Sequence, residues 1–318
     1  MNRLLAVAVL QVLLVVSAQG GSAVAEQPGS AVLQAGRQSV VGVLPVWKAR
    51  PANLEEPEGS GVVVGDGTLV LTADHILGNA TRVRIRSLDG EFAEAGIVAR
   101  DSETDLALLR MPFRLPPLAF AGYPVVGEEI CAIGNAFGLG ISVTCGSVSA
   151  VRRSGVGFNP IEDFIQTDAA VNPGMSGGAL IDGEGALIGI LSAIFTKQSD
   201  ANIGVNFAVS APLAELALER LQLEMTQPWP RAGLQLRSFP PRGGSGRAGA
   251  VVVDIVPDSP AARADLQVGD IVLRAGNRRI FGPPDLRTAI AMQPIEERLL
   301  IETSRGGDRI QLELFIAE

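Results

Sequence analysis

The sequence predicts a mainly β fold, because strand periodicity and turn residues dominate it. In residues 82–86, Val83 and Ile85 alternate with arginines, the period-two pattern of a strand with one face in water. Helical spacing of apolar residues is scarce, and 37 glycines and 20 prolines supply the turns that a β protein needs. With 318 residues, of which 47% are hydrophobic, the chain is long enough for two domains.

The chain opens on an apolar stretch from Leu4 to Val16, which follows Arg3 and is interrupted only by Gln11. This length is short for a membrane span and fits the core of a signal peptide, and residues 23–25 (AVA) form a small-x-small cleavage site. We therefore predict a signal peptide over residues 1–25 and an exported protein. An uncleaved N-terminal anchor is the alternative, since no charged stop sequence decides between the two.

The composition excludes some partners. A net charge of −8 predicts no affinity for nucleic acid or anionic lipid. One histidine and two cysteines cannot supply a four-ligand zinc shell without help from carboxylates, so we expect no metal and no cofactor.

The single histidine, His75, begins a possible catalytic series with Asp105 and Ser176, in that chain order. A serine hydroxyl is a poor nucleophile at neutral pH and needs a base that titrates near the working pH, which an imidazole provides. A buried carboxylate on the other ring nitrogen would fix the tautomer and stabilise the imidazolium. Each residue alone has a simpler explanation, as a packed histidine, a strand cap or a loop serine. Their joint occurrence predicts a serine protease triad.

Asp105 is predicted as the carboxylate because of its position. It leads directly into the apolar run of residues 106–109, whereas Asp101 and Glu103 lie in a polar turn. Ser176 lies in NPGMSGG at residues 172–178, a tight turn in which glycines allow positive φ and close approach to a substrate. We expect the amides of Gly174 and Ser176 to form the oxyanion hole.

Four segments together resemble the HtrA/Deg family of trypsin-like proteases: TADHIL at 72–77, DSETDLA at 101–107, AIGNAFGLG at 132–140 and FIQTDAAVN at 164–172. The resemblance implies a double six-stranded β-barrel protease domain, here residues 38–225, after a short N-terminal segment at 26–37. It also implies one or two PDZ domains, a homotrimer, a location in the cell envelope such as the periplasm, and unfolded or partly folded polypeptides as substrates.

Other features follow from the same resemblance. It puts Ala170, Ile194 and Val205 near the primary specificity pocket, with no acidic side chain among them. The chain also departs from the family, which usually has Asn at the position of Met175 and Pro at that of Ala136. Met175 cannot make the hydrogen bonds of an amide side chain, so we expect the activity to depend on how the oxyanion turn is held.

A boundary follows the predicted barrels. Ser210 and Pro212 mark a helix start, and the helix has an apolar stripe that includes Leu213, Ala217 and Leu221. TQPWP at 226–230 then ends the helix and forms a short, stiff linker.

Residues 231–318 resemble a PDZ domain through VVVDIV at 251–256, DSPAA at 258–262 and GDIVL at 269–273. The resemblance places Ala232, Gly233 and Leu234 in the loop that binds the carboxylate of a peptide C-terminus, and a helix over residues 285–292 across the groove. Residues 299–302 and 310–314 are expected to pair in a closing hairpin. A glycine-rich β domain without a peptide groove is the alternative.

Cys131 and Cys145 lie on two predicted strands on either side of a glycine-rich loop. A cross-strand disulfide and two buried thiols both remain open, because sequence separation does not show how close the Cα atoms come.

The sequence thus predicts an exported serine endopeptidase whose PDZ domain binds peptide C-termini. The alternative is a PDZ-based peptide-binding or chaperone-like protein with an idle protease site.

Overall fold

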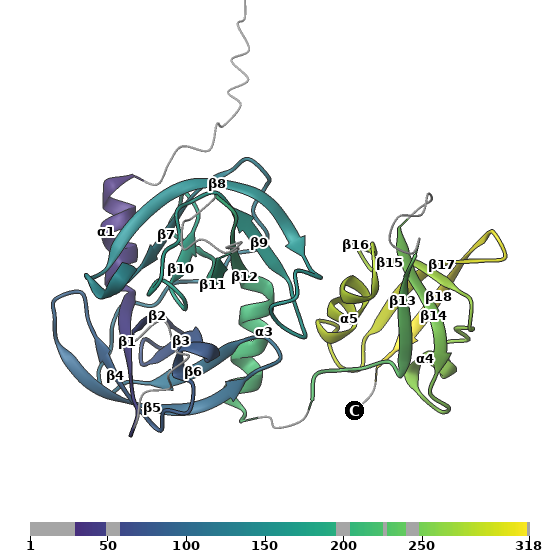
Figure 1. Cartoon of the computed structure of the whole chain (residues 1–318), viewed down its shortest axis with the longest axis horizontal. Helices are drawn as coiled ribbons and strands as arrows, with labels where there is room; N and C mark the ends of the chain where they lie inside the picture. The colour runs from purple at the N-terminus through teal and green to yellow at the C-terminus, as the bar shows by residue number, and fades with distance from the viewer. Residues whose placement is uncertain (1–28, 49–57, 195–203, 225–227, 240–247, 317–318) are drawn as a thin grey trace, which may run out of the picture.

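Two closed β-barrels and a third β-sheet form the part of the chain described by this computed structural model, which is residues 29–48, 58–194, 204–224, 228–239 and 248–316 (Figure 1). The predicted mainly β fold and its two six-stranded barrels are confirmed. The predicted signal segment lies outside the described residues. Among the helices that are described, none has both the length and the apolar character needed to cross a membrane.

The first barrel closes in the order β1-β2-β3-β6-β5-β4. In β4, Val83 and Ile85 are buried inside the barrel, as their alternation predicts. Strands β2 and β3 are buried along their whole length, because one face lines the barrel and the other packs against the second barrel. The strands are β1 (Val40–Val46), β2 (Gly59–Val64), β3 (Leu69–Ala73), β4 (Arg82–Arg86), β5 (Phe92–Asp101) and β6 (Leu106–Arg110).

The second barrel closes in the order β10-β11-β12-β9-β8-β7. Its interior is a separate apolar cluster, and the two barrels share a larger cluster between them. The short 3-10 helix η1 (Ala136–Gly138) connects β7 to β8. The strands are β7 (Glu129–Gly134), β8 (Ser142–Arg153), β9 (Phe164–Thr167), β10 (Ala179–Ile181), β11 (Leu187–Ile194) and β12 (Asn206–Ser210).

Three helices accompany the barrels: α1 (Ser30–Gln38), the single turn α2 (Asp74–Leu77) and α3 (Ala211–Gln222). The predicted helix after the barrels is α3, and the Ser210 hydroxyl caps it by accepting from the N–H of Leu213 at 3.4 Å. Leu213, Ala217 and Leu221 are buried against the shared core. Helix α1 occupies most of the predicted N-terminal segment, for which the sequence indicated no helix.

The third sheet has its own apolar core and the order β13-β14-β15-β17-β18, with β16 paired to β15. The predicted closing hairpin is present, with Leu299 opposite Leu314. The sheet comprises β13 (Leu234–Phe239), β14 (Gly249–Ile255), β15 (Ile271–Ala275), β16 (Arg278–Arg279), β17 (Arg298–Arg305) and β18 (Asp308–Phe315).

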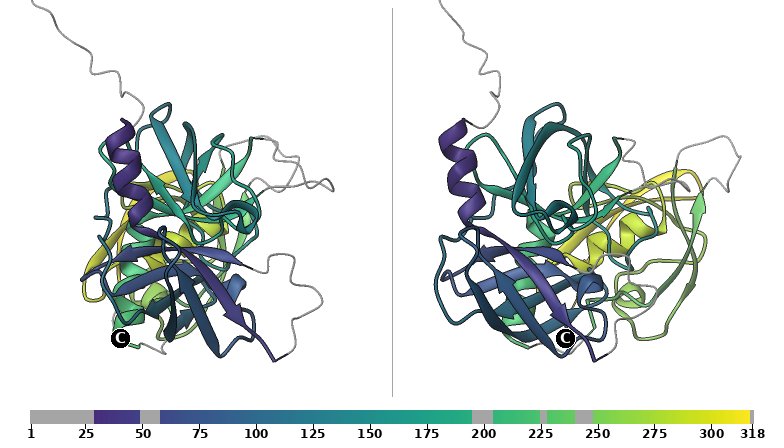
Figure 2. Two further views of the ribbon diagram at one scale, coloured as in Figure 1. Left: turned by 90° about the vertical axis from the view of Figure 1, so that its left-hand side faces the viewer. Right: turned by 60° about the vertical axis from the view of Figure 1, so that its left-hand side comes forward.

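Two helices, α4 (Pro260–Arg263) and α5 (Pro283–Ala291), complete this domain. Helix α5 starts two residues earlier than predicted, because prolines fit the first turn, where the missing N–H has no helical partner to lose. Helix α5 lies on the side of the domain that faces the barrels (Figures 1 and 2) and contacts residues 154–162 of the second barrel.

Candidate active site

His75 and Asp105 lie side by side at the surface of the first barrel. The Asp105 carboxylate has one oxygen 2.7 Å from Nδ1 of the ring, and its other oxygen accepts from the backbone N–H of His75 at 2.9 Å. Asp105 reaches both groups from a left-handed conformation with φ of 60°. Its side chain is only 12% exposed against 46% for His75, so the carboxylate is shielded and the ring remains accessible. In a neutral imidazole this contact keeps the proton on Nδ1 and makes Nε2 the acceptor.

Ser176 belongs to the same cluster through Ser192. The Ser192 hydroxyl donates to the Asp105 carboxylate at 3.1 Å, and its carbonyl accepts from the Ser176 hydroxyl at 3.4 Å. Ser60 holds the turn from the other barrel, because its N–H donates to the Ser176 carbonyl at 2.8 Å and its hydroxyl to the Gly174 carbonyl at 2.7 Å. The three predicted residues thus meet where the two barrels join.

Ser60 and Ser192 contact the candidate site directly, and sequence reasoning missed both. Each is a lone polar residue in a buried strand, and both are almost fully inaccessible to solvent. A buried hydroxyl needs a hydrogen-bond partner. That rule is the available sequence signal, although it does not say which partner.

The turn around Ser176 requires glycine at two positions. Gly174 and Gly177 have φ of 90° and 82°. A Cβ at Gly177 would lie 2.1 Å from the Ser60 carbonyl oxygen, and one at Gly174 would lie 2.4 Å from the Asn135 carbonyl oxygen. Any other residue would therefore displace the turn.

One contact sets the direction of the Gly174 amide. The Pro173 carbonyl accepts from the N–H of Phe137 in η1 at 2.7 Å. Because C=O and N–H point in opposite directions across a trans peptide, the N–H of Gly174 points away from η1.

Met175 is fully buried in the core of the second barrel. Gly134 lets it approach closely, since a Cβ there would lie 3.0 Å from the Met175 Cα and Cβ atoms. The turn is therefore anchored at this residue by apolar packing rather than by side-chain hydrogen bonds.

The residues predicted for the specificity pocket gather around Asn206. Ile194 pairs with Asn206 at the end of β11, and Val205 precedes Asn206 in the chain. The Asn206 amide donates to the carbonyl of Ala169 at 2.7 Å, next to Ala170. The three predicted residues thus come from two strand ends and from the segment that leads to Ser176.

Cys131 in β7 and Cys145 in β8 are directly opposite in register and form a disulfide, with Cα atoms 4.1 Å apart. This settles the choice that the sequence left open between a disulfide and two thiols. The register explains it, because a directly opposed pair brings the two Cβ atoms within bonding reach.

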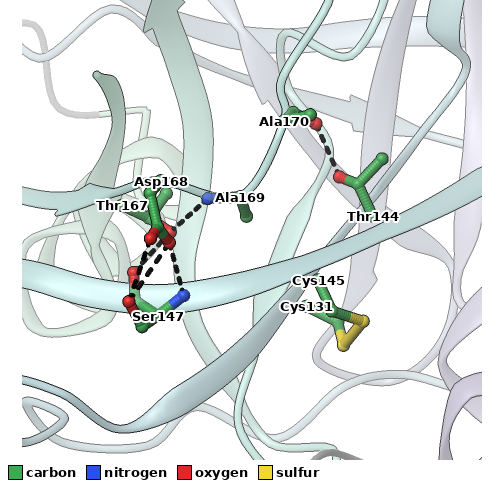
Figure 3. The surroundings of a disulfide bond; sticks show 8 residues. All are labelled: Cys131, Thr144, Cys145, Ser147, Thr167, Asp168, Ala169 and Ala170. Atoms are coloured by element: carbon green, nitrogen blue, oxygen red, sulfur yellow. Dashed lines mark hydrogen bonds between the residues drawn. A yellow bond between two sulfur atoms is a disulfide. The ribbon is translucent and has the colours of Figure 1, made fainter. Parts of the chain in front are cut away.

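The strand that carries Cys145 also holds the segment before the Ser176 turn (Figure 3). The Thr144 hydroxyl donates to the Ala170 carbonyl at 2.5 Å, and the Ser147 N–H donates to the Asp168 carboxylate at 2.6 Å. The disulfide therefore cross-links the hairpin on which residues 168–170 rest.

Comparison with known proteins gives consistent matches. Residues 59–190 match the model of a trypsin-like peptidase domain, and residues 201–316 match that of a PDZ domain. The chain is 33% identical over 269 residues to serine endoprotease DegS of Haemophilus influenzae, covering 82% of this chain and 77% of DegS. This chain belongs to the HtrA/Deg family of serine endoproteases. The family and the PDZ domain that the sequence predicts are both confirmed.

Two further HtrA relatives extend the comparison. A solved structure described as HtrA-type protease AlgW with tripeptide is 32% identical, has a TM-score of 0.71, and is covered over 97% of its chain by 91% of this one. Periplasmic serine endoprotease DegP of Escherichia coli is 34% identical over 266 residues, which are 80% of this chain. This HtrA chain spans 56% of the length of DegP.

The PDZ domain of this HtrA chain has a groove of about 400 Å³ between β13 and α5. Ala232, Gly233 and Leu234 are among the residues that line it. The Ala232 and Gly233 carbonyls accept from the N–H groups of Ala261 and Val256, so they turn into the domain. The N–H groups of Gly233 and Leu234 therefore point the other way.

Protease residues border this groove as well. The Trp229 indole N–H donates to the Asp101 carboxylate at 2.8 Å, and Arg231 pairs with Glu103 at 3.2 Å. Both acceptors belong to the turn of residues 101–105, which ends at Asp105. The groove and the Asp105 carboxylate are thus connected through one turn.

A second set of contacts joins α5 to residues 154–162. The Thr288 hydroxyl donates to the Glu162 carbonyl at 2.9 Å, and the Ser154 hydroxyl donates to Asp285. The buried Glu162 carboxylate accepts from four consecutive backbone N–H groups, those of residues 156–159. One carboxylate therefore shapes the loop on which the PDZ helix rests.

Proposed function

We propose that this protein is an exported serine endopeptidase in which Ser176 is the nucleophile, His75 the general base and Asp105 the carboxylate that orients it. The observation that carries the proposal is the 2.7 Å contact between His75 Nδ1 and Asp105, whose carboxylate is tied to the Ser176 turn through Ser192. The contact between His75 and Asp105 provides an accessible base, a fixed tautomer and a shielded counter-charge at one point.

In the proposed reaction, Nε2 of His75 takes the proton of the Ser176 hydroxyl as the oxygen attacks the scissile carbonyl carbon. The N–H groups of Gly174 and Ser176 stabilise the resulting oxyanion, and loss of one such donor costs about 3 to 4 kcal/mol. His75 then protonates the leaving amine, and a water molecule hydrolyses the acyl-enzyme. The contact from Phe137 to Pro173 supports the role of Gly174, because it keeps the carbonyl of that peptide away from the oxyanion site.

We infer that Ala170, Ile194 and Val205 line the primary specificity pocket. Their apolar character favours a small or medium apolar residue before the cut, by about 1 to 3 kcal/mol for a methylene or two. A cleavage map of an unfolded protein tests this. Cuts mainly after Lys or Arg would contradict it.

The PDZ groove is proposed to bind the C-termini of peptides. The outward N–H groups of Gly233 and Leu234 support a carboxylate site, and Ala232 completes the loop. Bound peptides are expected to raise the protease activity only by their differential affinity for the active arrangement. Cleavage rates with free and amidated apolar peptides measure this effect. Equal rates with both, in protein that binds them, would limit the groove to tethering substrates.

We propose that residues 38–225 form the protease domain, 226–230 the linker and 231–318 the PDZ domain, after an N-terminal segment at 26–37 and a signal peptide or anchor at 1–25. Unfolded or partly folded polypeptides are the proposed substrates, in a homotrimeric enzyme. A periplasmic location is proposed because DegP, a relative of this chain, is named a periplasmic endoprotease.

The test is cleavage of unfolded casein by the protein without its predicted signal peptide, residues 1–25, compared with its Ser176→Ala variant. We expect the variant to lose cleavage and to keep its unfolding transition, because the substitution removes the nucleophile but very little packing. Equal cleavage by both proteins would reject the triad. Inactivity of both, with intact peptide binding, would favour the chaperone-like alternative.

A further inference from the structure

The helix that carries His75 is a single turn of four residues, Asp74–Leu77. A helix this short has no stability of its own, so contacts from outside must hold it. Asp105 holds one side, because its carbonyl accepts from the N–H of Asp74 at 3.0 Å and its carboxylate from that of His75 at 2.9 Å.

Arg100, at the end of β5, holds the same turn through three hydrogen bonds. Its Nε donates to the Asp74 carboxylate, Nη2 donates to the Asp74 carbonyl at 3.2 Å, and Nη1 donates to the Gly78 carbonyl at 2.6 Å. One guanidinium therefore spans the turn from its first residue to the residue that ends it. The side chains of Asp74 and Arg100 are 12% and 35% exposed, so the contact is partly shielded from water.

We propose that Arg100 is a positioning residue for His75, an inference that rests on the proposed catalytic role of that histidine. The His75 side chain is 46% exposed, so the place of the ring depends strongly on the backbone of α2, in addition to its contact with the Asp105 carboxylate. Arg100 also directly precedes the turn that ends at Asp105. One strand end thus sets the positions of both the base and its carboxylate.

The three contacts require the planar fork of a guanidinium. A lysine ammonium keeps the charge, but it cannot place donors on the carboxylate and on both carbonyls. A methionine keeps much of the aliphatic stem and removes every donor. These two substitutions at Arg100 therefore separate charge, hydrogen bonding and packing.

The experiment compares Arg100→Met and Arg100→Lys with Arg82→Met as a matched control. Arg82 pairs with Glu94 on β5 of the same barrel, and both side chains are well exposed. A displacement of about 1 Å can cost about 100-fold in rate. We expect Arg100→Met to lower kcat by about 10- to 100-fold with little change in KM, Arg100→Lys to lie between, and Arg82→Met to match the parent.

A second readout separates positioning from folding. Phosphonylation of Ser176 by a fluorophosphonate needs the base but no bound polypeptide, so its rate should fall in parallel with kcat. Both rates are divided by the folded fraction of each variant, measured by circular dichroism at the same temperature. Asp74→Asn retains an oxygen that accepts from Arg100, so it should keep most of the rate that Arg100→Met loses.

Two results would reject the positioning role of Arg100. If Arg100→Met matches Arg82→Met in both rates, or loses activity only in proportion to its folded fraction, the positioning role is rejected while the triad stands. If Ser176→Ala cleaves as well as the parent, the triad is rejected and the role of Arg100 with it.

Discussion

The Asp163 carboxylate, immediately before β9 in the second barrel, forms a buried ion pair with the guanidinium of Arg278 in the PDZ domain. Their side chains are 0% and 7% exposed. The hydroxyls of Tyr123 and Ser210 donate to the same carboxylate. The contact between the two domains therefore includes a charge that depends on a partner from the other domain.

Arg278→Met should destabilise the protein by about 3 to 5 kcal/mol, because it leaves the Asp163 carboxylate buried without its cation. Arg298→Met removes an exposed pair with Glu313 and should change stability by no more than about 1 kcal/mol. Urea unfolding of the whole chain measures both. Equal losses would mean that the buried pair is no more important than a surface pair.

Tyr123, the only tyrosine of the chain, should resist ionisation in the folded protein. Burial raises the pKa of its phenol well above the usual range, and the Asp163 carboxylate adds to the effect. Ultraviolet absorbance should therefore show phenolate at higher pH in native protein than in unfolded protein, where tyrosine titrates at about pH 10.

The same shift predicts how stability changes with pH. Above about pH 10 the unfolded state releases the phenol proton while the folded state retains it, so this contribution to stability is complete below that pH and falls as pH rises. Tyr123→Phe should lack that part of the alkaline loss. Parallel curves for variant and parent would contradict the assignment.

Cleavage should fall at acid pH, once His75 binds a second proton on its ring. The protonated ring cannot accept the hydroxyl proton of Ser176, and the chain has no other histidine to replace it. The measurement is kcat/KM against pH. A flat profile from about pH 5 to 8 would point to another group or another step.

Reduction of the Cys131–Cys145 disulfide should cost about 3 kcal/mol of stability, the value expected for a loop of this length, whose cysteines are 14 residues apart. Cleavage should weaken too, because the hairpin holds the carbonyl of Ala170. Unfolding with and without reductant tests this, with Cys131→Ala/Cys145→Ala as a variant that should not respond to reductant. If the parent protein were also insensitive to reductant, the disulfide would have no role in stability or cleavage.

Met175→Ala should lower both stability and kcat, since a buried methionine cut to alanine costs about 2 to 5 kcal/mol and loosens the turn beside Ser176. Met175→Leu should stay within about 1.5 kcal/mol of the parent and keep its activity. Calorimetry and casein cleavage are the measurements. Full activity in a destabilised Met175→Ala variant would show that the geometry of the turn beside Ser176 does not depend on the packing of Met175.

The sequence predicted the barrels, the PDZ domain and the hairpin because their signals are local: alternation as in β4, a serine cap before α3, and short motifs in a fixed order. It could not predict the pair between Asp163 and Arg278 or the bond from Trp229 to Asp101. Those contacts join residues far apart in the chain, and nothing near either residue indicates its partner. The roles of Ser192 and Arg100 could not be predicted for the same reason, since they depend on which strands become neighbours.

Trp229 and Arg231 also affect where the chain can be divided. They come from the predicted linker and the start of the PDZ domain, yet they bond to the turn of residues 101–105. A recombinant protease that stops at residue 225 would lose the indole that donates to Asp101 and leave Glu103 without its arginine. One that continues through Arg231 would retain both. A protease that ends inside the predicted PDZ domain therefore keeps two contacts that the predicted boundary would remove, while the Asp163 carboxylate still loses Arg278.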